Sequence, residues 1–78
     1  MTPTPPSLAE LAELVALQLG RRQVDAGANL IDDLGASSVE LVSLLAAIED
    51  RWGIGLDETV FATVESVAEL HVAVSEAC

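Results

Sequence analysis

The chain contains no lysine and only three arginines, whereas it contains thirteen aspartates and glutamates, so its formal net charge at pH 7 is −10. A surface this acidic repels the phosphate backbone of a nucleic acid and an anionic membrane. We therefore exclude nucleic acids and membranes as partners. Such an imbalance often serves solubility alone. It also attracts basic patches on partner proteins, and the presence of seven of the thirteen acids between Asp32 and Glu58 favours this second interpretation.

Cysteine and histidine occur once each, as Cys78 and His71. A single cysteine forms no intrachain disulfide, and the pair offers no metal-ligand cluster. Catalysis by a nucleophile needs a base beside it, and the one histidine falls inside the last expected helix. The segment 35–39 does not complete a Gly-x-Ser-x-Gly turn, and Asp32 and Asp33 lack the alternating acids of a calcium-binding loop. We expect neither an enzyme nor a metal site.

The sequence has no long apolar run, and its N-terminus has no basic segment. We therefore expect no signal peptide and no membrane span. Together with the single cysteine, this favours the reducing cytoplasm. The first six residues are rich in proline and threonine and predict a flexible segment over residues 1–6. The remaining residues 7–78 are enough for one small domain.

Aromatic residues are also scarce, because Trp52 and Phe61 are the only two. With 51% hydrophobic residues, the core must be built mainly from leucine, valine, isoleucine and alanine. Apolar residues recur at helical spacing and nowhere alternate over the length of a strand, which predicts an all-α fold. The expected helices run from a cap at Ser7 to about Leu19, from Ser38 to about Arg51, over a short turn at Asp57–Phe61, and from a cap at Thr63 or Ser66 to about Glu76.

A long loop separates the first two expected helices, from about Gln23 to Ala36. It lacks helical periodicity and contains two glycines. We expect its apolar residues to reach into the core and hold it in place: Val24, Leu30, Ile31 and Leu34. A loop of this length in a small domain usually carries function.

The second expected helix has two apolar sides. One side faces the core and comprises Leu41, Leu44, Leu45, Ile48 and Trp52. The other is a short stripe of Val39, Val42 and Ala46, bordered by Glu40, Ser43, Glu49 and Asp50. Isolated exposed valines are common on protein surfaces and need no function. An apolar stripe bordered by acids is also typical of a docking surface, with apolar contact for affinity and carboxylates for steering.

Two neighbouring serines stand where this helix begins. Ser37 and Glu40 have the spacing of a capping box, which predicts that Ser37 caps the helix and leaves Ser38 free on its first turn. The start of a helix favours negative charge, so a hydroxyl there suits attachment of a phosphodiester. Many Ser-Ser pairs do no more than begin a helix.

The segment 34–38, Leu-Gly-Ala-Ser-Ser, resembles the signature Leu-Gly-x-Asp-Ser-Leu of the acyl carrier protein family. Three further segments are similar to the family's pattern, namely residues 29–35, residues 48–54 and residues 62–67. The resemblance as a whole covers about Leu8 to Val74. The resemblance implies a four-helix bundle with a long loop between helices I and II and a short helix III. One departure is Ser37, because the family most often has Asp or His at this position.

By this resemblance, Ser38 receives 4′-phosphopantetheine covalently from coenzyme A, and the chain holds acyl or aminoacyl groups as thioesters. The partner enzymes would be a phosphopantetheinyl transferase and an acyltransferase, ketosynthase or adenylating ligase with basic docking patches. The carrier would be a monomer that forms transient complexes with these enzymes. The family's docking face corresponds to Val39, Glu40, Val42, Ala46, Glu49 and Asp50.

The cargo stays open at this stage. Peptidyl carriers usually show Gly-Gly-His/Asp-Ser-Leu, so fatty acid or polyketide assembly is preferred, with a discrete carrier of an amino-acid-derived starter unit as a further option. The alternative function is an acidic helical docking or scaffold module that is derived from a carrier and is never modified at Ser38.

Overall fold

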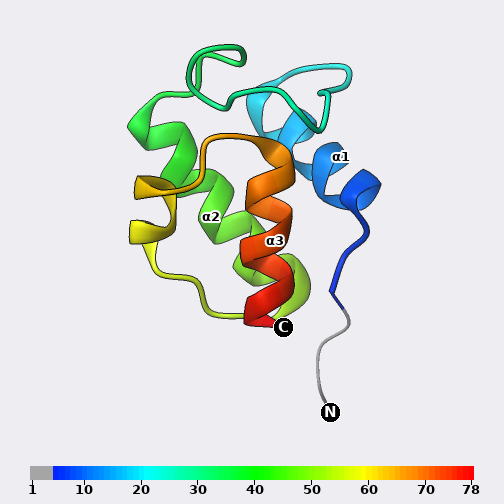
Figure 1. Ribbon diagram of the computed structural model, residues 1–78, viewed down its shortest axis with the longest axis vertical. Helices are drawn as coiled ribbons and strands as arrows, with labels where there is room; N and C mark the ends of the chain where they lie inside the picture. Colours follow the sequence, from blue (N-terminus) through cyan, green and yellow to red (C-terminus); the bar gives the residue numbers. More distant parts are fainter. Residues whose placement is uncertain (1–4) are drawn as a thin grey trace.

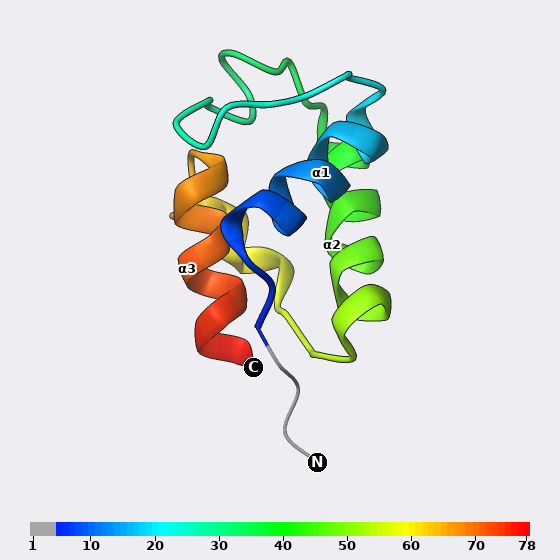
Figure 2. The ribbon, with the colours of Figure 1, turned by 90° about the vertical axis from the view of Figure 1, so that its right-hand side faces the viewer.

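The computed structural model describes residues 5–78, apart from the side chain of Glu58, and these residues form an all-helical fold without strands. The elements are α1 (Leu8–Leu19), α2 (Ser38–Trp52), the 3-10 helix η1 (Glu58–Ala62) and α3 (Val67–Ala77). Helix α1 packs against both α2 and α3, and α2 also contacts η1. Figure 1 shows α2 and α3 descending from the same end of the molecule, and Figure 2 shows α1 running obliquely from α3 toward α2.

The all-α class and the positions of the three long helices are confirmed. Where we expected a short helical turn, the chain forms a 3-10 helix, so the described residues comprise three α-helices and η1 and do not establish a bundle of four.

Local hydrogen bonds form the start of η1. The side chain of Asp57 accepts a hydrogen bond from the backbone N–H of Thr59 at 3.0 Å, which holds the pKa of that carboxyl below its usual value. The backbone N–H of Val60 donates to the carbonyl of Asp57, three residues back, which is 3-10 geometry.

Local sequence signals explain where the helices begin and end. Ser7 and Glu10 form a complete capping box, and this bonding lowers the pKa of Glu10. Gly20 follows α1 in the left-handed conformation, at φ 69°, which glycine adopts at little cost. Of the two caps considered for the last helix, Ser66 is the one used, because its hydroxyl accepts from the N–H of Glu69. Thr63 instead follows η1.

The core is aliphatic, as predicted. Trp52 and Phe61 are only half-buried and pack at its edge. The residues of the buried cluster come from every α-helix and from the loops on both sides of α2: Leu11, Val15, Leu30, Leu44, Ile48, Ile54, Val67, Leu70 and Val74.

The N-terminal segment contacts α3 before α1 begins. Residues 1–4 of the expected flexible segment lie outside the described residues. Pro6 is buried, and its carbonyl oxygen accepts a hydrogen bond from Nε2 of His71 at 2.8 Å. His71 is half-buried, and this hydrogen bond joins the segment before α1 to α3.

The long loop between α1 and α2 lies across one end of the bundle (Figure 2). Leu30 is buried, and Val24 and Leu34 are half-buried against the core, as predicted. The prediction for Ile31 is wrong, because its side chain is 59% exposed. The amide oxygen of Asn29 accepts from the backbone N–H groups of both Ile31 and Asp32, at 2.9 and 2.8 Å. This turn points Leu30 inward and Ile31 outward.

Leu30 and Ile31 form a matched pair for a stability test. We expect Leu30→Ala to lower the free energy of unfolding by about 2–5 kcal/mol, because it leaves a cavity under the loop. Ile31→Ala removes a comparable side chain from the surface and should cost less than about 0.5 kcal/mol. Urea denaturation followed by circular dichroism measures both. Equal losses for the two variants would contradict the placement of the loop.

Candidate functional site

The start of α2 has the capping arrangement that the sequence predicts. The hydroxyl of Ser37 accepts a hydrogen bond from the backbone N–H of Glu40 at 3.2 Å, and Oε1 of Glu40 accepts from the N–H of Ser37 at 3.0 Å. The capping box is therefore confirmed. Ser37 Oγ is engaged in the cap, and Ser38 is the first residue of the helix with an exposed side chain.

The chain reverses directly before these serines. Gly35 has a positive φ of 66°, and its N–H donates to the carbonyl of Ile31 at 3.0 Å. The N–H of Ala36 donates to the carbonyl of Leu30 at 2.9 Å, and Ala36 itself is buried. An L-residue with a Cβ is strained at this φ, which accounts for the glycine. The turn buries Ala36 and leaves Ser37 and Ser38 at the surface.

Asn29 and Asp33 organise the loop from within. Besides the two bonds to the amide of Asn29, the carboxylate of Asp33 accepts from the N–H of Asn29 at 2.8 Å. Asp33 and Leu34 both donate their N–H groups to the carbonyl of Asn29 at 3.0 Å. At least one of the acids near Ser38 is thus needed for the loop's shape.

Arg21 has a role that the sequence does not reveal. It follows Gly20 directly after the end of α1, where a cation complements the negative end of the helix dipole. In addition, Nη2 of Arg21 donates to the carbonyl oxygen of Leu34 at 2.7 Å, immediately before Gly35. The bond connects the end of α1 to the turn that precedes Ser38. No local pattern predicts it, because the two residues are thirteen positions apart.

The residues of the expected docking face all lie on α2, but they differ in exposure and in whether they form hydrogen bonds within the chain. Val39 is 75% exposed and Val42 is 52% exposed, and Ala46 and Asp50 are exposed as well. Glu40 is half-buried and belongs to the capping box. Glu49 is also half-buried, and its Oε2 accepts from the backbone N–H of Leu56 at 3.0 Å. This carboxylate therefore also holds the segment that leads to η1.

Other side chains that could support chemistry are dispersed. The described part of the chain contains no group of three or more histidine, cysteine or acidic residues that could hold a metal ion. His71 contacts Pro6. None of the helices formed by residues 5–78 combines the length and the apolar character that a membrane span requires.

A protein-family comparison matches residues 9–71 to the family described as "Phosphopantetheine attachment site". The chain belongs to this family. The cofactor of the family is 4′-phosphopantetheine, attached covalently, and the chain is a carrier protein rather than an enzyme. An exposed serine at a helix start fits that chemistry, because a phosphodiester requires an accessible hydroxyl and is favoured by the positive end of the helix dipole.

Several relatives that are named acyl carrier proteins agree with this assignment. The carrier is 36% identical over 59 residues to acyl carrier protein MbtL of Mycobacterium bovis, covering 76% of this chain and 70% of the relative, and the protein of the same name from Mycobacterium tuberculosis matches equally. The acyl carrier protein of Thermotoga maritima is 31% identical over 64 residues, covering 80% and 79% of the two chains.

A solved structure shares the carrier's fold. It is a solution structure of 3-oxo-butyl-ACP, an intermediate mimic from the actinorhodin polyketide synthase of Streptomyces coelicolor. The TM-score is 0.75 with 21% sequence identity, over 97% of this chain and 94% of the other. The likeness shows that both chains share one fold.

The bond from Arg21 to Leu34 gives a prediction for the loop of the carrier. Arg21→Ala should lower the free energy of unfolding by about 1 kcal/mol and speed amide hydrogen exchange at Gly35 and Ala36, because the turn loses its tie to α1. Arg22→Ala removes the same charge from the next position. It should change the free energy of unfolding by less than about 0.5 kcal/mol and leave the exchange rates at Gly35 and Ala36 unchanged. If Arg22→Ala speeds this exchange as much as Arg21→Ala does, the charge and not the hydrogen bond is responsible.

Proposed function

We propose that Ser38 is the residue of this carrier that bears the phosphopantetheine arm. The proposal depends on the different positions of the two serines. The hydroxyl of Ser37 is engaged as the cap of α2, whereas Ser38 is exposed on the first turn. When attached, the arm supplies a flexible thiol that holds an acyl or aminoacyl group as a thioester. Tethering raises the effective concentration of that group at each enzyme that docks.

The chain's own residues would position the arm and select partners. The amino end of α2 favours the negative phosphodiester. We propose the α2 docking face, defined as Val39, Glu40, Val42, Ala46, Glu49 and Asp50, as the surface that partner enzymes contact. Exposure of Val39 and Val42 supports apolar contact, and the exposed Asp50 supports steering toward basic patches. Glu40 and Glu49 would act there while also capping α2 and holding the segment before η1.

The wider assignments are proposals as well. Carrier proteins in general interact with phosphopantetheinyl transferases and synthase enzymes, and for this chain we propose an acyltransferase, a ketosynthase or an adenylating ligase of fatty acid or polyketide assembly. Residues 7–78 would form the carrier domain, with η1 in the place of the short helix III, and one cysteine suits a reducing cytoplasm. The competing function is a docking module that is never modified.

Modification by a phosphopantetheinyl transferase tests the assignment of Ser38. Incubation of the full chain with the transferase and coenzyme A should add one phosphopantetheine group and release 3′,5′-adenosine bisphosphate, seen as a single increment in the intact mass of the chain. Ser38→Ala should abolish the increment, whereas Ser37→Ala should retain it and cost about 1 kcal/mol of stability through loss of the cap.

Two outcomes would overturn this proposal. An unmodified wild-type chain, under conditions that fully load another carrier, would favour the docking module. An increment that persists in Ser38→Ala and disappears in Ser37→Ala would move the attachment site to the neighbouring serine.

The α2 docking face is tested with a pair of valines of similar exposure on different helices. Val42 on α2 is 52% exposed and Val72 on α3 is 56% exposed. We expect Val42→Ser to lower kcat/KM of the transferase about tenfold, because a buried valine contact is worth about 1–2 kcal/mol. Val72→Ser should leave the rate unchanged. Added salt should slow the wild-type reaction by screening the acidic surface. Equal rates for the two variants would place docking elsewhere.

A further inference from the structure

The loop segment 29–36, which leads to the two serines, is closed by hydrogen bonds within itself. Among the described residues, two hydrogen bonds join this segment to other parts of the chain. Near its beginning, the N–H of Leu30 donates to the carbonyl of Glu65, just before α3. Near its end, Nη2 of Arg21 donates to the carbonyl of Leu34, and Arg21 follows directly after α1. The segment is therefore attached at both ends, and Arg21 holds the end that is closer to the serines.

The two ends of the segment differ in how far they are buried. Leu30 at the first end is fully buried, so packing holds it in addition to its hydrogen bond. At the second end, Leu34 is half-buried and Gly35 is exposed, and the buried Ala36 contributes a single methyl group. The bond from Arg21 has a charged donor and a length of 2.7 Å, which places it among the stronger hydrogen bonds. The second end therefore depends more on its hydrogen bond than the first end does.

The turn at this second end determines how α2 begins. Ser37 caps the helix from an extended conformation, at φ −83° and ψ 168°, and exchanges two hydrogen bonds with Glu40. If the turn at Gly35 loosens, part of the population loses this cap, and the first turn of α2 frays with Ser38 on it. Only molecules with the turn intact then present Ser38 in the arrangement seen here. An enzyme that recognises this arrangement binds the chain more weakly in proportion to their fraction.

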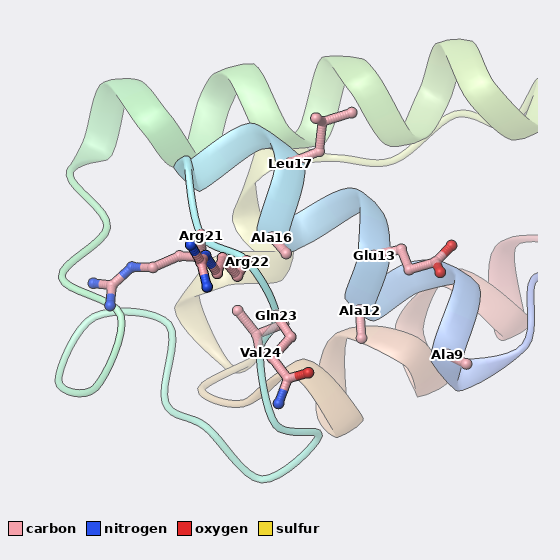
Figure 3. Close-up of a pocket in the computed structure, with 9 residues that line it drawn as sticks. All are labelled: Ala9, Ala12, Glu13, Ala16, Leu17, Arg21, Arg22, Gln23 and Val24. Atoms are coloured by element: carbon pink, nitrogen blue, oxygen red, sulfur yellow. The ribbon is translucent and has the colours of Figure 1, made fainter.

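The charge of Arg21 predicts the opposite effect. The chain has a net charge of −10, and a basic partner is attracted to its acids, so an arginine near Ser38 opposes the attraction. Removal of this cation should strengthen docking if charge alone matters, and weaken it if the hydrogen bond to Leu34 matters. Arg22 allows the two effects to be separated, because it carries the same charge and is exposed beside Arg21 (Figure 3).

We propose that Arg21 is a positioning residue for the modification of Ser38. It holds the carbonyl of Leu34, and through it the turn at Gly35, in the arrangement from which the transferase accepts the serine. The inference rests on the proposed function, since it takes Ser38 as the attachment site. In the transfer, the oxygen of Ser38 bonds to the phosphorus of the pantetheine phosphate and the pyrophosphate bond of coenzyme A breaks. The serine proton and 3′,5′-adenosine bisphosphate are released, and Arg21 does not touch the reacting atoms.

The test is the steady-state kinetics of a phosphopantetheinyl transferase, with the full chain as the varied substrate. Arg21→Ala should raise the KM for the chain about three- to tenfold and leave kcat unchanged, because saturating concentrations supply enough of the competent fraction. Arg21→Lys keeps a charged donor at this position and should recover most of the loss. Arg22→Ala should leave KM unchanged or lower it.

Two controls separate positioning from a general loss of stability. Ser7→Ala removes the cap of α1 and destabilises the chain at a distance from the serines, and it should leave KM unchanged while circular dichroism shows a folded protein. In the chain labelled with ¹⁵N, Arg21→Ala should shift the amide signals of residues 34–40. Neither Ser7→Ala nor Arg22→Ala should shift them.

The inference is overturned if Arg21→Ala has the KM of the wild type, if Arg22→Ala raises KM to the same extent, or if Arg21→Lys is no better than Arg21→Ala. A wild-type chain that is modified at Ser38, together with any of these results, refutes the role of Arg21 and leaves the attachment site standing. A wild-type chain that the transferase does not modify refutes both proposals. The two failures are thus distinguished by the wild type alone.

Discussion

The structure depends on backbone hydrogen bonds that join the long loop to the start of α3. The N–H of Leu30 donates to the carbonyl of Glu65 at 2.8 Å, and Val67 and Ala68 donate to the carbonyls of Ala28 and Ala26 at 3.2 and 2.8 Å. The N–H groups at the start of a helix have no partner within it, so the loop satisfies donors that α3 would otherwise expose. In return, these bonds hold Leu30 in the core. The turn at Gly35 and the two serines follow within eight residues, and their position is set by this attachment.

What the sequence predicts well is local. The capping boxes of Ser7 and Ser37 rest on residues three positions apart, and each is present. What it does not predict depends on contacts between distant residues. Ile31 is as apolar as Leu30, and only the turn made by Asn29 decides which of them is buried. The bonds from Arg21 to Leu34 and from Leu56 to Glu49 likewise require the folded chain. The exposure of Val39 and Val42 was predictable because it follows from helical spacing alone.

The acids around Ser38 have a structural use in addition to the steering that we propose for them. Asp33, Glu40 and Glu49 each accept a hydrogen bond from a backbone N–H, so part of the cluster is explained by the loop, the helix cap and the segment after α2. A carboxylate that accepts such a bond still contributes to the field of the surface. The hydrogen bonds of these three carboxylates are therefore compatible with the proposed steering of partner proteins. They fix those charges in place, while the exposed Asp32 and Asp50 remain available for direct contact with a partner.

The serine at position 37 has an electrostatic consequence for the proposed attachment site. Serine and aspartate cap a helix about equally well, since either oxygen accepts the same backbone hydrogen bond. An aspartate, which the family pattern often has here, would also place a negative charge next to the phosphodiester. With Ser37, the cap is kept and that repulsion is removed. In a chain with a net charge of −10, the positive end of the helix dipole is then free to favour the phosphate, and we propose that acids farther along α2 supply the charge that steers partners.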